Sequence, residues 1–346
     1  MKRRLAAAAV FAALFAFAAA WVLHAQKSYP DANEMRAHME EGKCADCHQE
    51  IWEEWETSGH AQAWESKLYQ KLRAQYEDAP KACDPCHAPQ PILITGAGAK
   101  LTKENPYPMP LLRSEGKKSG VDCLTCHLDA DGSMKGPYND PSPFHKTKAS
   151  NVYYTRQIQL CGSCHGQPKV AAHNQVKDRG EGSRETCQRC HMPETQRKPS
   201  QYSAEVKRSA SHAFLGSRSE EFLQSAYYLD YETTEEGVQL YLTNTADHPV
   251  PAAPLREIEL RIRIAAADGA VLHDARETHK HPLDEAGKPV QPAAKDIRLK
   301  ANETRVIAVP LNRASLSGAE MNATVRYRRT ADDPWILMTE LKAPLN

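Results

Sequence analysis

Five copies of one short pattern, Cys-x-x-Cys-His, constrain this chain more than any other feature of its sequence. The chain has 346 residues and ten cysteines, and every cysteine belongs to one of the five copies. Two thiols at this spacing can each form a thioether with a haem vinyl group, and the histidine beside the second thiol can bind the iron. The attaching cysteines would be Cys44, Cys47, Cys83, Cys86, Cys123, Cys126, Cys161, Cys164, Cys187 and Cys190, and the proximal iron ligands His48, His87, His127, His165 and His191.

Two other uses of cysteine compete with haem attachment. Ten cysteines in an exported chain could pair as disulfides, and Cys-x-x-Cys pairs also bind zinc. Neither use requires a histidine directly after the second cysteine, yet all five motifs have one and no cysteine is left over. The sequence therefore predicts five covalently bound haem c groups.

The motifs lie so close together that little chain is available to each haem. Their first cysteines are Cys44, Cys83, Cys123, Cys161 and Cys187. Segments this short cannot enclose a side-chain core of their own, so the porphyrins would form the core and folding would depend on them. We expect a domain of short helices and loops in which the haems pack closely enough to carry electrons across the protein.

The ligand opposite each proximal histidine decides what its iron can do. Two histidines give a saturated, low-potential iron suited to electron transfer, methionine raises the potential, and an empty position admits a small molecule. The strongest candidates for this distal position are His60, His145 and His212, and weaker ones are His38, His173, Met35, Met39 and Met192. For each histidine the alternative is a solvated or hydrogen-bonded side chain. The distal partner of His48 is the hardest to identify.

The N-terminus has the layout of an export signal. Basic residues at positions 2–4 precede an apolar run of 19 residues, Leu5–Leu23, which is followed by polar sequence. This pattern is typical of a secretory signal, here with cleavage after Ala25. The run is also long enough to cross a bilayer, so residues 1–25 could instead remain as a membrane anchor. Either way we expect export, to the periplasm or the cell surface.

The charge balance bears on the partners of the chain. Lysine plus arginine and aspartate plus glutamate both number 44, so the formal net charge is zero. A chain without a basic excess is not suited to binding nucleic acid. The expected partners are redox proteins, either a quinol-oxidising membrane complex or other cytochromes. Assembly into a homo-oligomer or a larger cytochrome complex is a further alternative.

Several segments around the motifs resemble a known family. Trp55–Ala61, Gly120–Cys123, Leu160–Gly166, Cys190–Pro193 and Ser211–Phe214 are similar to the multihaem cytochromes typified by the tetrahaem electron carrier of ammonia-oxidising bacteria. The likeness covers residues from about 40 to 216. It implies haems stacked in parallel and perpendicular pairs, with His60, His145 and His212 as distal ligands. A fifth motif and an appended domain depart from the family.

Enzymes related to that family differ from this chain in their catalytic features. Nitrite reductases of the group mostly carry Cys-x-x-Cys-Lys at the catalytic haem, and no such motif occurs here. Hydroxylamine-oxidising relatives cross-link a tyrosine to the haem, whereas Tyr153 and Tyr154 are interpreted as packing residues. No residue is assigned a catalytic role.

The last part of the chain contains no cysteine and has the pattern of β-strands. After an expected helix from about Ser217 to Leu229, apolar residues alternate with polar ones in three segments, 238–242, 258–264 and 321–327. Period-two alternation separated by turn residues is typical of half-buried antiparallel strands. We expect an immunoglobulin-like β-sandwich.

Segments of this second region also resemble the β-domain appended to many multihaem cytochromes. They are Asn244–Pro251 with Arg256, and Asp296–Arg305. The resemblance implies that His248 can face the haem region as a further candidate ligand, the alternative being a loop histidine. His279 and His281 are expected to be surface residues of a loop, and Pro193–Ser211 is expected to be solvated linker.

Together these patterns predict an α + β protein with three parts. They are residues 1–25 as signal or anchor, 26–222 as a pentahaem cytochrome domain of helices and loops, and 223–346 as the β-sandwich. The expected function is electron transfer along mostly bis-histidine haems. Two alternatives remain, an oxidoreductase that acts on a small nitrogen or sulfur compound at one five-coordinate haem, and a subunit of a larger assembly docked through the β-domain.

Overall fold

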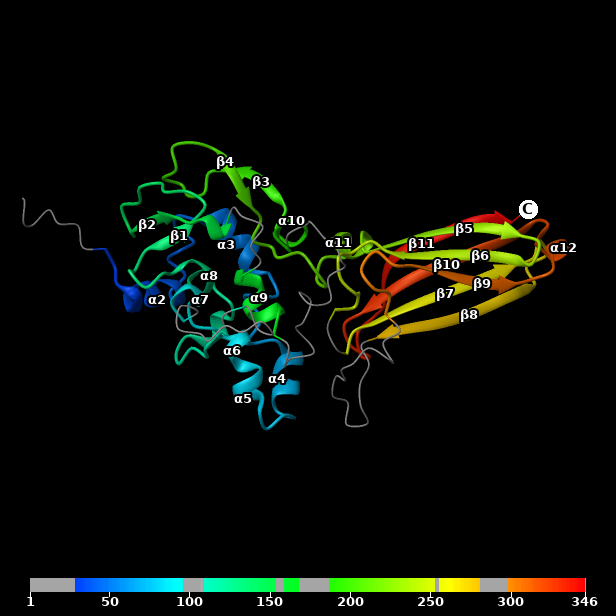
Figure 1. The fold of residues 1–346 in the computed structure, drawn as a ribbon, viewed down its shortest axis with the longest axis horizontal. Coiled ribbons are helices and arrows are strands. Elements are labelled where there is room, and N and C mark those ends of the chain that lie inside the picture. Colours follow the sequence, from blue (N-terminus) through cyan, green and yellow to red (C-terminus); the bar gives the residue numbers. More distant parts are fainter. Residues whose placement is uncertain are drawn as a thin grey trace, which may run out of the picture.

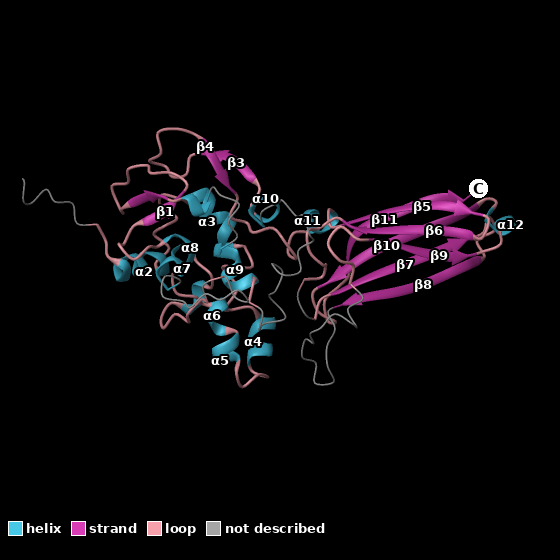
Figure 2. Cartoon of the chain, in the orientation of Figure 1, coloured by secondary structure: helices cyan, strands magenta, loops and turns pink. Residues whose placement is uncertain are grey.

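The protein consists of two lobes that lie end to end (Figure 1). The helical lobe extends from α2 (Ala32–Glu40) to the hairpin β3–β4, and the β lobe from β5 (Tyr227–Thr234) to β11 (Ile336–Leu345). Helices dominate the first lobe and long strands the second, as Figure 2 shows, which confirms the α + β class. The computed structural model describes residues 29–95, 107, 109–153, 159–167, 187–252, 255–280 and 298–345.

The helices of the first lobe are short, and several of them consist of the motifs themselves. In one α-helical turn, residues i, i+3 and i+4 lie on one face, so a Cys-x-x-Cys-His segment presents both thiols and its imidazole together. The first motif forms such a turn before α3, because the His48 amide donates to the Cys44 carbonyl over 3.0 Å. The helices are α2, α3 (Gln49–Glu56), α4 (Lys67–Arg73), α5 (Ala79–Ala82), α6 (Asp84–His87), α7 (Ile92–Thr95), α8 (Cys123–His127), α9 (Gln159–His165) and α10 (Cys187–His191).

A buried ion-pair network holds the third motif. Asp122 caps α8, accepting from the Thr125 amide at 3.1 Å and from Arg113 Nη1 at 2.9 Å, and Arg36 also binds it. The Asp122 side chain is fully buried. Removing one partner of such a network would leave a charge unpaired in the interior, which is strongly destabilising. The network therefore fixes α8 to α2 and to the loop before it.

The side-chain core of the helical lobe is small. Among the described residues its cluster of packed, buried apolar side chains has six members, whereas that of the β lobe has 22. A lobe of this size needs a larger apolar core than such a cluster supplies. This imbalance agrees with the expectation that the porphyrins complete the core.

The expected solvated linker at Pro193–Ser211 is wrong. Residues in this segment form an antiparallel hairpin, β3 (Glu194–Arg197) with β4 (Lys207–Ala210). Arg197 is buried and binds Glu54 of α3, so the hairpin packs against the helical lobe. The lobe also contains a short parallel pair, β1 (Met134–Gly136) with β2 (Thr147–Ala149).

The β lobe contains two antiparallel sheets over one shared core. The expected alternation is confirmed, because Leu240 in β6, Ile262 in β7 and Ala323 in β10 all face the interior. The sheets have the orders β5–β6–β9 and β11–β10–β7–β8. The remaining elements are β6 (Gly237–Asn244), β7 (Glu257–Ala265), β8 (Val271–Lys280), β9 (Thr304–Pro310), β10 (Ala319–Arg328) and α12 (Arg313–Leu316).

Two details of this lobe correct the sequence-based expectations. The expected helix at 217–229 is only α11 (Glu220–Gln224), and Tyr227 already begins a strand. His279, expected on the surface, lies on β8 opposite Ile258 and is fully buried. Thr278 and Lys280 on either side of it are exposed, and this register turns the imidazole into the core. His281 and the apolar run Leu5–Leu23 lie outside the described residues, among which no helix is long and apolar enough to cross a membrane.

Candidate haem-binding site

Four of the five motif histidines each face a second histidine at nearly the same separation. An imidazole nitrogen binds a first-row transition metal at about 2 Å, with its ring centre about 1 Å behind, so two rings on opposite sides of one ion have centroids about 6 Å apart. The observed centroid distances are 6.3 Å for His48–His145, 6.2 Å for His127–His212, 6.2 Å for His165–His60 and 6.1 Å for His191–His248. Each pair is therefore spaced to hold one iron between its rings.

The motif histidines are oriented by backbone carbonyls. A histidine that donates from Nδ1 keeps the lone pair on Nε2, which leaves that nitrogen available for a metal. Nδ1 of His48 donates to Pro199 O at 2.6 Å, and Nδ1 of His87 donates to Ala63 O at 2.7 Å. In the same way, His127 donates to Lys135 O at 2.5 Å and His191 donates to Leu215 O. These four side chains are thus prepared as Nε2 ligands.

The facing histidines share this arrangement in three cases. Nδ1 of His145 donates to Lys146 O at 3.2 Å, that of His212 to Ala210 O at 3.0 Å, and that of His248 to Pro249 O at 3.1 Å. His60 differs, because its Nδ1 is buried and has no hydrogen-bond partner among the described residues. Burial lowers the pKa of His60 to about 3 and, with His127 nearby, that of His212 to about 4. Both rings are neutral, as a metal ligand must be.

A glycine positions His60 against the third motif. The Val121 amide donates to the His60 carbonyl at 2.9 Å, so the His60 loop packs directly on the Gly120–Cys123 segment. Gly120 has φ +59°, and a Cβ there would lie 2.4 Å from the His60 carbonyl oxygen. Only glycine accepts both the positive φ and this close approach.

His212 is held by a carboxylate and an arginine. Its backbone amide donates to Glu54 Oε2 at 2.7 Å, and Arg197 Nη2 donates to both oxygens of Glu54 at 2.7 and 2.9 Å. Phe214 then packs between two ligand candidates, with its ring 4.2 Å from His60 and 5.9 Å from His212. The hairpin β3–β4 therefore fixes where His212 points.

His248 comes from the β lobe and faces the last motif. It follows β6, and Asn244 Nδ2 holds its loop by donating to the His248 carbonyl at 3.0 Å and to Leu299 O at 3.2 Å. The His248 ring lies nearly parallel to that of His191, at 10°. Burial, opposed by the bond to Pro249 O, lowers the pKa of His248. The second lobe thus contributes a side chain to the site built by the first.

The second motif has a different neighbour. The Tyr69 ring stacks on His87 at 3.6 Å and 8°, and its hydroxyl donates to Asp84, which Arg73 also binds at 2.7 and 2.8 Å. Burial and the bond to Asp84 raise the pKa of Tyr69, and burial lowers that of His87. The stack fixes the plane of the His87 ring. Sequence reasoning did not single out Tyr69.

The cysteines of different motifs are close to one another. None of the ten forms a disulfide. Thiol–thiol contacts join the first motif to the third, the second to the fourth and the fourth to the fifth, through Cys44–Cys123, Cys86–Cys164 and Cys161–Cys187. Cys126 also lies near Cys161 and Cys164. All five motifs are therefore linked by neighbouring attachment points.

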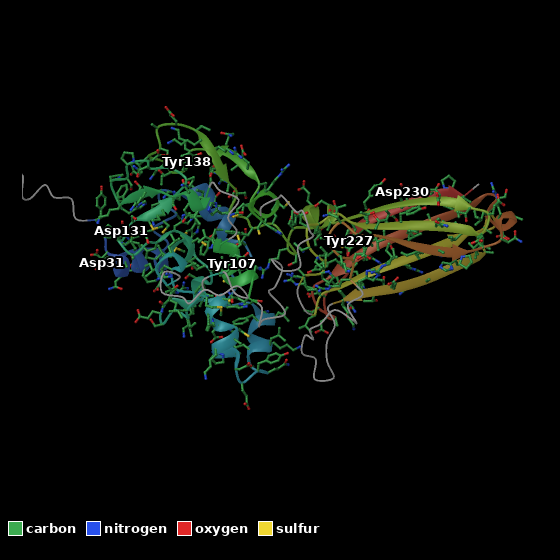
Figure 3. The ribbon with its side chains drawn as sticks, viewed as in Figure 1. Asp31, Tyr107, Asp131, Tyr138, Tyr227 and Asp230 are labelled. Carbon is green, nitrogen blue, oxygen red and sulfur yellow. The ribbon has the colours of Figure 1, made fainter. Side chains whose placement is uncertain are left out.

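The fourth motif is packed against a tyrosine. Tyr107 lies beside α9 (Figure 3), and a Cβ at Gly162 or Gly166 would lie 2.5 or 2.8 Å from its ring. Both glycines of the segment Cys161–Gly166 therefore permit close packing. Tyr153 plays a similar part at the third motif, where its ring stacks on His127 at 5.1 Å.

The structure places the other candidates less favourably. His38 is half-buried in the last turn of α2, and in the described part of the chain it makes no ring contact with a motif histidine. Met39 is buried with its sulfur 3.9 Å from Cys44 Sγ, which is a packing position. His173 lies outside the described residues. The carbonyls that orient the motif histidines carry no signal in the sequence, because any residue can supply one.

Comparisons with known proteins point to the same cofactor. The model of the family "Cytochrome c554 and c-prime" matches residues 43–128, and that of "Outer membrane cytochrome MtrC/MtrF-like, domains II/IV" matches residues 101–204. No curated protein matches the chain. A solved structure, the penta-heme cytochrome c552 from Thermochromatium tepidum, is 19% identical with a TM-score of 0.62, over 88% of this chain and 98% of that one.

Another match covers a smaller part of the chain. β-Glucuronidase 2 of Bacteroides uniformis is 17% identical over 35% of this chain and 13% of its own, with a TM-score of 0.18, too low to support an argument. The cytochrome likeness therefore shows the fold of nearly the whole chain. Together with the five motifs and the two family models, it identifies the chain as a multihaem c-type cytochrome.

Proposed function

We propose that the chain is an exported pentahaem cytochrome that transfers electrons along mostly bis-histidine haems between respiratory redox partners. The observation that carries this proposal is the set of four histidine pairs with centroids 6.1–6.3 Å apart, each on a different motif histidine. Bis-histidine iron is saturated, so it exchanges electrons rather than binding substrate. Covalently bound haem c supplies the iron that gains and loses one electron.

The residues of this chain hold the cofactors and exclude water from them. Each pair of thiols fixes one porphyrin, the Nδ1 bonds of the histidines set their rings, and Phe214 closes the space between His60 and His212. His60, His145, His212 and His248 are the proposed distal ligands, and His173 is a remaining candidate for the site of His87. No residue is assigned to catalysis.

The neighbouring attachment points support a continuous electron route. The thiol contacts give an order in which the first motif adjoins the third, and the fourth adjoins both the second and the fifth. The proximity of Cys126 to Cys161 and Cys164 connects the two groups. An electron entering at either end can then reach every site.

The β lobe is proposed to be an immunoglobulin-like sandwich that covers the last haem and supplies His248. Its two sheets of three and four strands and its shared core support this classification. A lobe that is itself non-conducting beside the fifth motif would insulate that site or seat the chain in a larger cytochrome assembly. The proposed boundary between residues 222 and 223 falls within α11.

A redox titration followed by visible spectroscopy tests the proposed function. We expect five one-electron equivalents per molecule, low midpoint potentials, and reduced haems that a soluble cytochrome reoxidises. Turnover of nitrite or hydroxylamine at a rate that exceeds electron exchange with protein partners would contradict the carrier role. In that case the oxidoreductase alternative would replace it.

A further inference from the structure

An exposed apolar patch lies on two neighbouring loops of the helical lobe. Phe144, Tyr202 and Val206 are 51%, 56% and 59% exposed, and they form what is called the Phe144 patch below. The Phe144 and Tyr202 rings lie 5.1 Å apart. Aromatic side chains in mutual contact and this far exposed mark an interaction surface more often than a solvated one.

The two loops that carry the patch are tied together. The Tyr138 hydroxyl donates to Arg208 O, and Lys207 forms an ion pair with Asp140. Figure 3 shows Tyr138 in the upper part of the helical lobe, far from Tyr227 of the β lobe. The patch is therefore a fixed surface, and its aromatic groups are not the tips of independent loops.

The patch covers the site of the first motif. Phe144 directly precedes His145, which faces His48. On the other side, the Gln201 amide beside Tyr202 donates to Cys47 O at 2.9 Å. Whatever rests on the patch is consequently nearest to the first of the five proposed haems.

The beginning of the described chain meets the same surface. The Tyr29 hydroxyl donates to Ser142 O at 3.3 Å, two residues before Phe144. Only residues 24–28 separate Tyr29 from the end of the apolar run at Leu23. The six residue steps from Leu23 to Tyr29 can span at most about 22 Å, because a fully extended chain covers about 3.3–3.6 Å per residue. A membrane-spanning run would therefore hold the patch close to the bilayer surface.

The charges around the patch suit a lipid surface better than a strongly charged protein. Exposed Lys146, Lys198 and Glu205 are neighbours of the patch in the sequence, and the carbonyl of exposed Asp46 accepts from Gln201 beside Tyr202, so no single sign dominates. Tyrosine is among the side chains enriched where proteins meet the membrane interface. The apolar contact, rather than charge, would then determine the docking.

We propose that residues 5–23 are retained as a membrane anchor and that the Phe144 patch rests on the lipid bilayer. The first haem site is then the one nearest the membrane, on the helical lobe, which lies at the other end of the molecule from the β lobe in Figure 1. This inference deepens the proposed function and rests on it, because it states where electrons from a membrane donor enter.

Hydrogen exchange of the full haem-loaded chain in vesicles of phosphatidylethanolamine and phosphatidylglycerol tests the inference. Relative to the same chain in detergent, peptides covering 141–146 and 200–206 are expected to exchange more slowly. The double variant Phe144→Ser/Tyr202→Ser should lose that protection while remaining in the vesicles. The matched variant Tyr228→Ser/Val271→Ser, at residues 57% and 53% exposed on the β lobe, should keep it.

Three results would overturn the proposal. One is an intact mass that lacks residues 1–25, which shows cleavage. Another is equal exchange of the patch peptides in vesicles and detergent. A third is protection in detergent that depends on protein concentration, which would assign the patch to a second copy of the chain. The redox titration described above is independent of all three, so failure of this inference is distinguishable from failure of the proposed function.

Discussion

Replacing His248 with glycine tests whether the β lobe supplies an iron ligand. The His248 ring lies 6.1 Å from His191 and nearly parallel to it, while the loop is held separately by Asn244 through the His248 backbone carbonyl. The substitution removes the imidazole but keeps that hydrogen bond. We therefore expect the β lobe to stay folded and in place.

The magnitude follows from the pairing of the histidines. Each described pair involves a different motif, so His248→Gly should convert one haem in five to high spin and leave the others low spin. Added imidazole should restore the low-spin state, because the lost side chain leaves space of its own size. In His248→Met one midpoint potential should rise, on the order of 0.1 V within the roughly 0.8 V that axial ligands span.

Visible absorption and electron paramagnetic resonance of the oxidised variants measure both effects. His38→Gly is the matched control, since His38 makes no ring contact with a motif histidine in the described part of the chain, and it should leave all spectra unchanged. Five low-spin haems in His248→Gly would refute the ligand role. A spectral change in His38→Gly of the same size would refute the pairing on which the prediction depends.

Three further predictions concern folding and attachment. Asp122→Ala should lower the free energy of unfolding by about 3–5 kcal/mol, because buried Arg113 and half-buried Arg36 lose their carboxylate partner. Exposed Glu41→Ala should have no measurable effect, and equal denaturation midpoints of the two variants would contradict this prediction. Leu240→Ala in the β lobe, at 0% exposure, should cost about 2–5 kcal/mol in a calorimetric scan, and a loss below 1 kcal/mol would show a looser core. Cys161→Ala/Cys164→Ala should lose one haem by mass spectrometry, and an unchanged mass increment would disprove attachment there.

Local patterns determined the parts of the fold that the sequence predicts well. A Cys-x-x-Cys-His segment needs only one helical turn, and α8 and α10 are little more than that turn. The alternation through Ile258–Ile264 predicts β7 because burial on one face of a strand repeats every second residue. Both signals lie within a few neighbouring residues, so no knowledge of distant contacts is needed.

Contacts between distant segments explain what the sequence did not predict. His48 had no obvious partner in the sequence, and the structure faces it with His145 because the loop before β2 folds back over the first motif. The hairpin β3–β4 forms because Arg197 finds Glu54 of α3, which its polar composition does not indicate. His279 is buried by the register of β8 against β7.

Low-temperature electron paramagnetic resonance of the whole oxidised protein, followed by carbon monoxide after reduction, tests the central claim most directly. The account predicts low-spin signals from the four described histidine pairs and no carbon monoxide binding at them, with the most anisotropic signal from His60–His165, whose rings cross at 61°. High-spin iron at more than one haem, or carbon monoxide binding at several, would contradict an electron-transfer chain built on paired histidines.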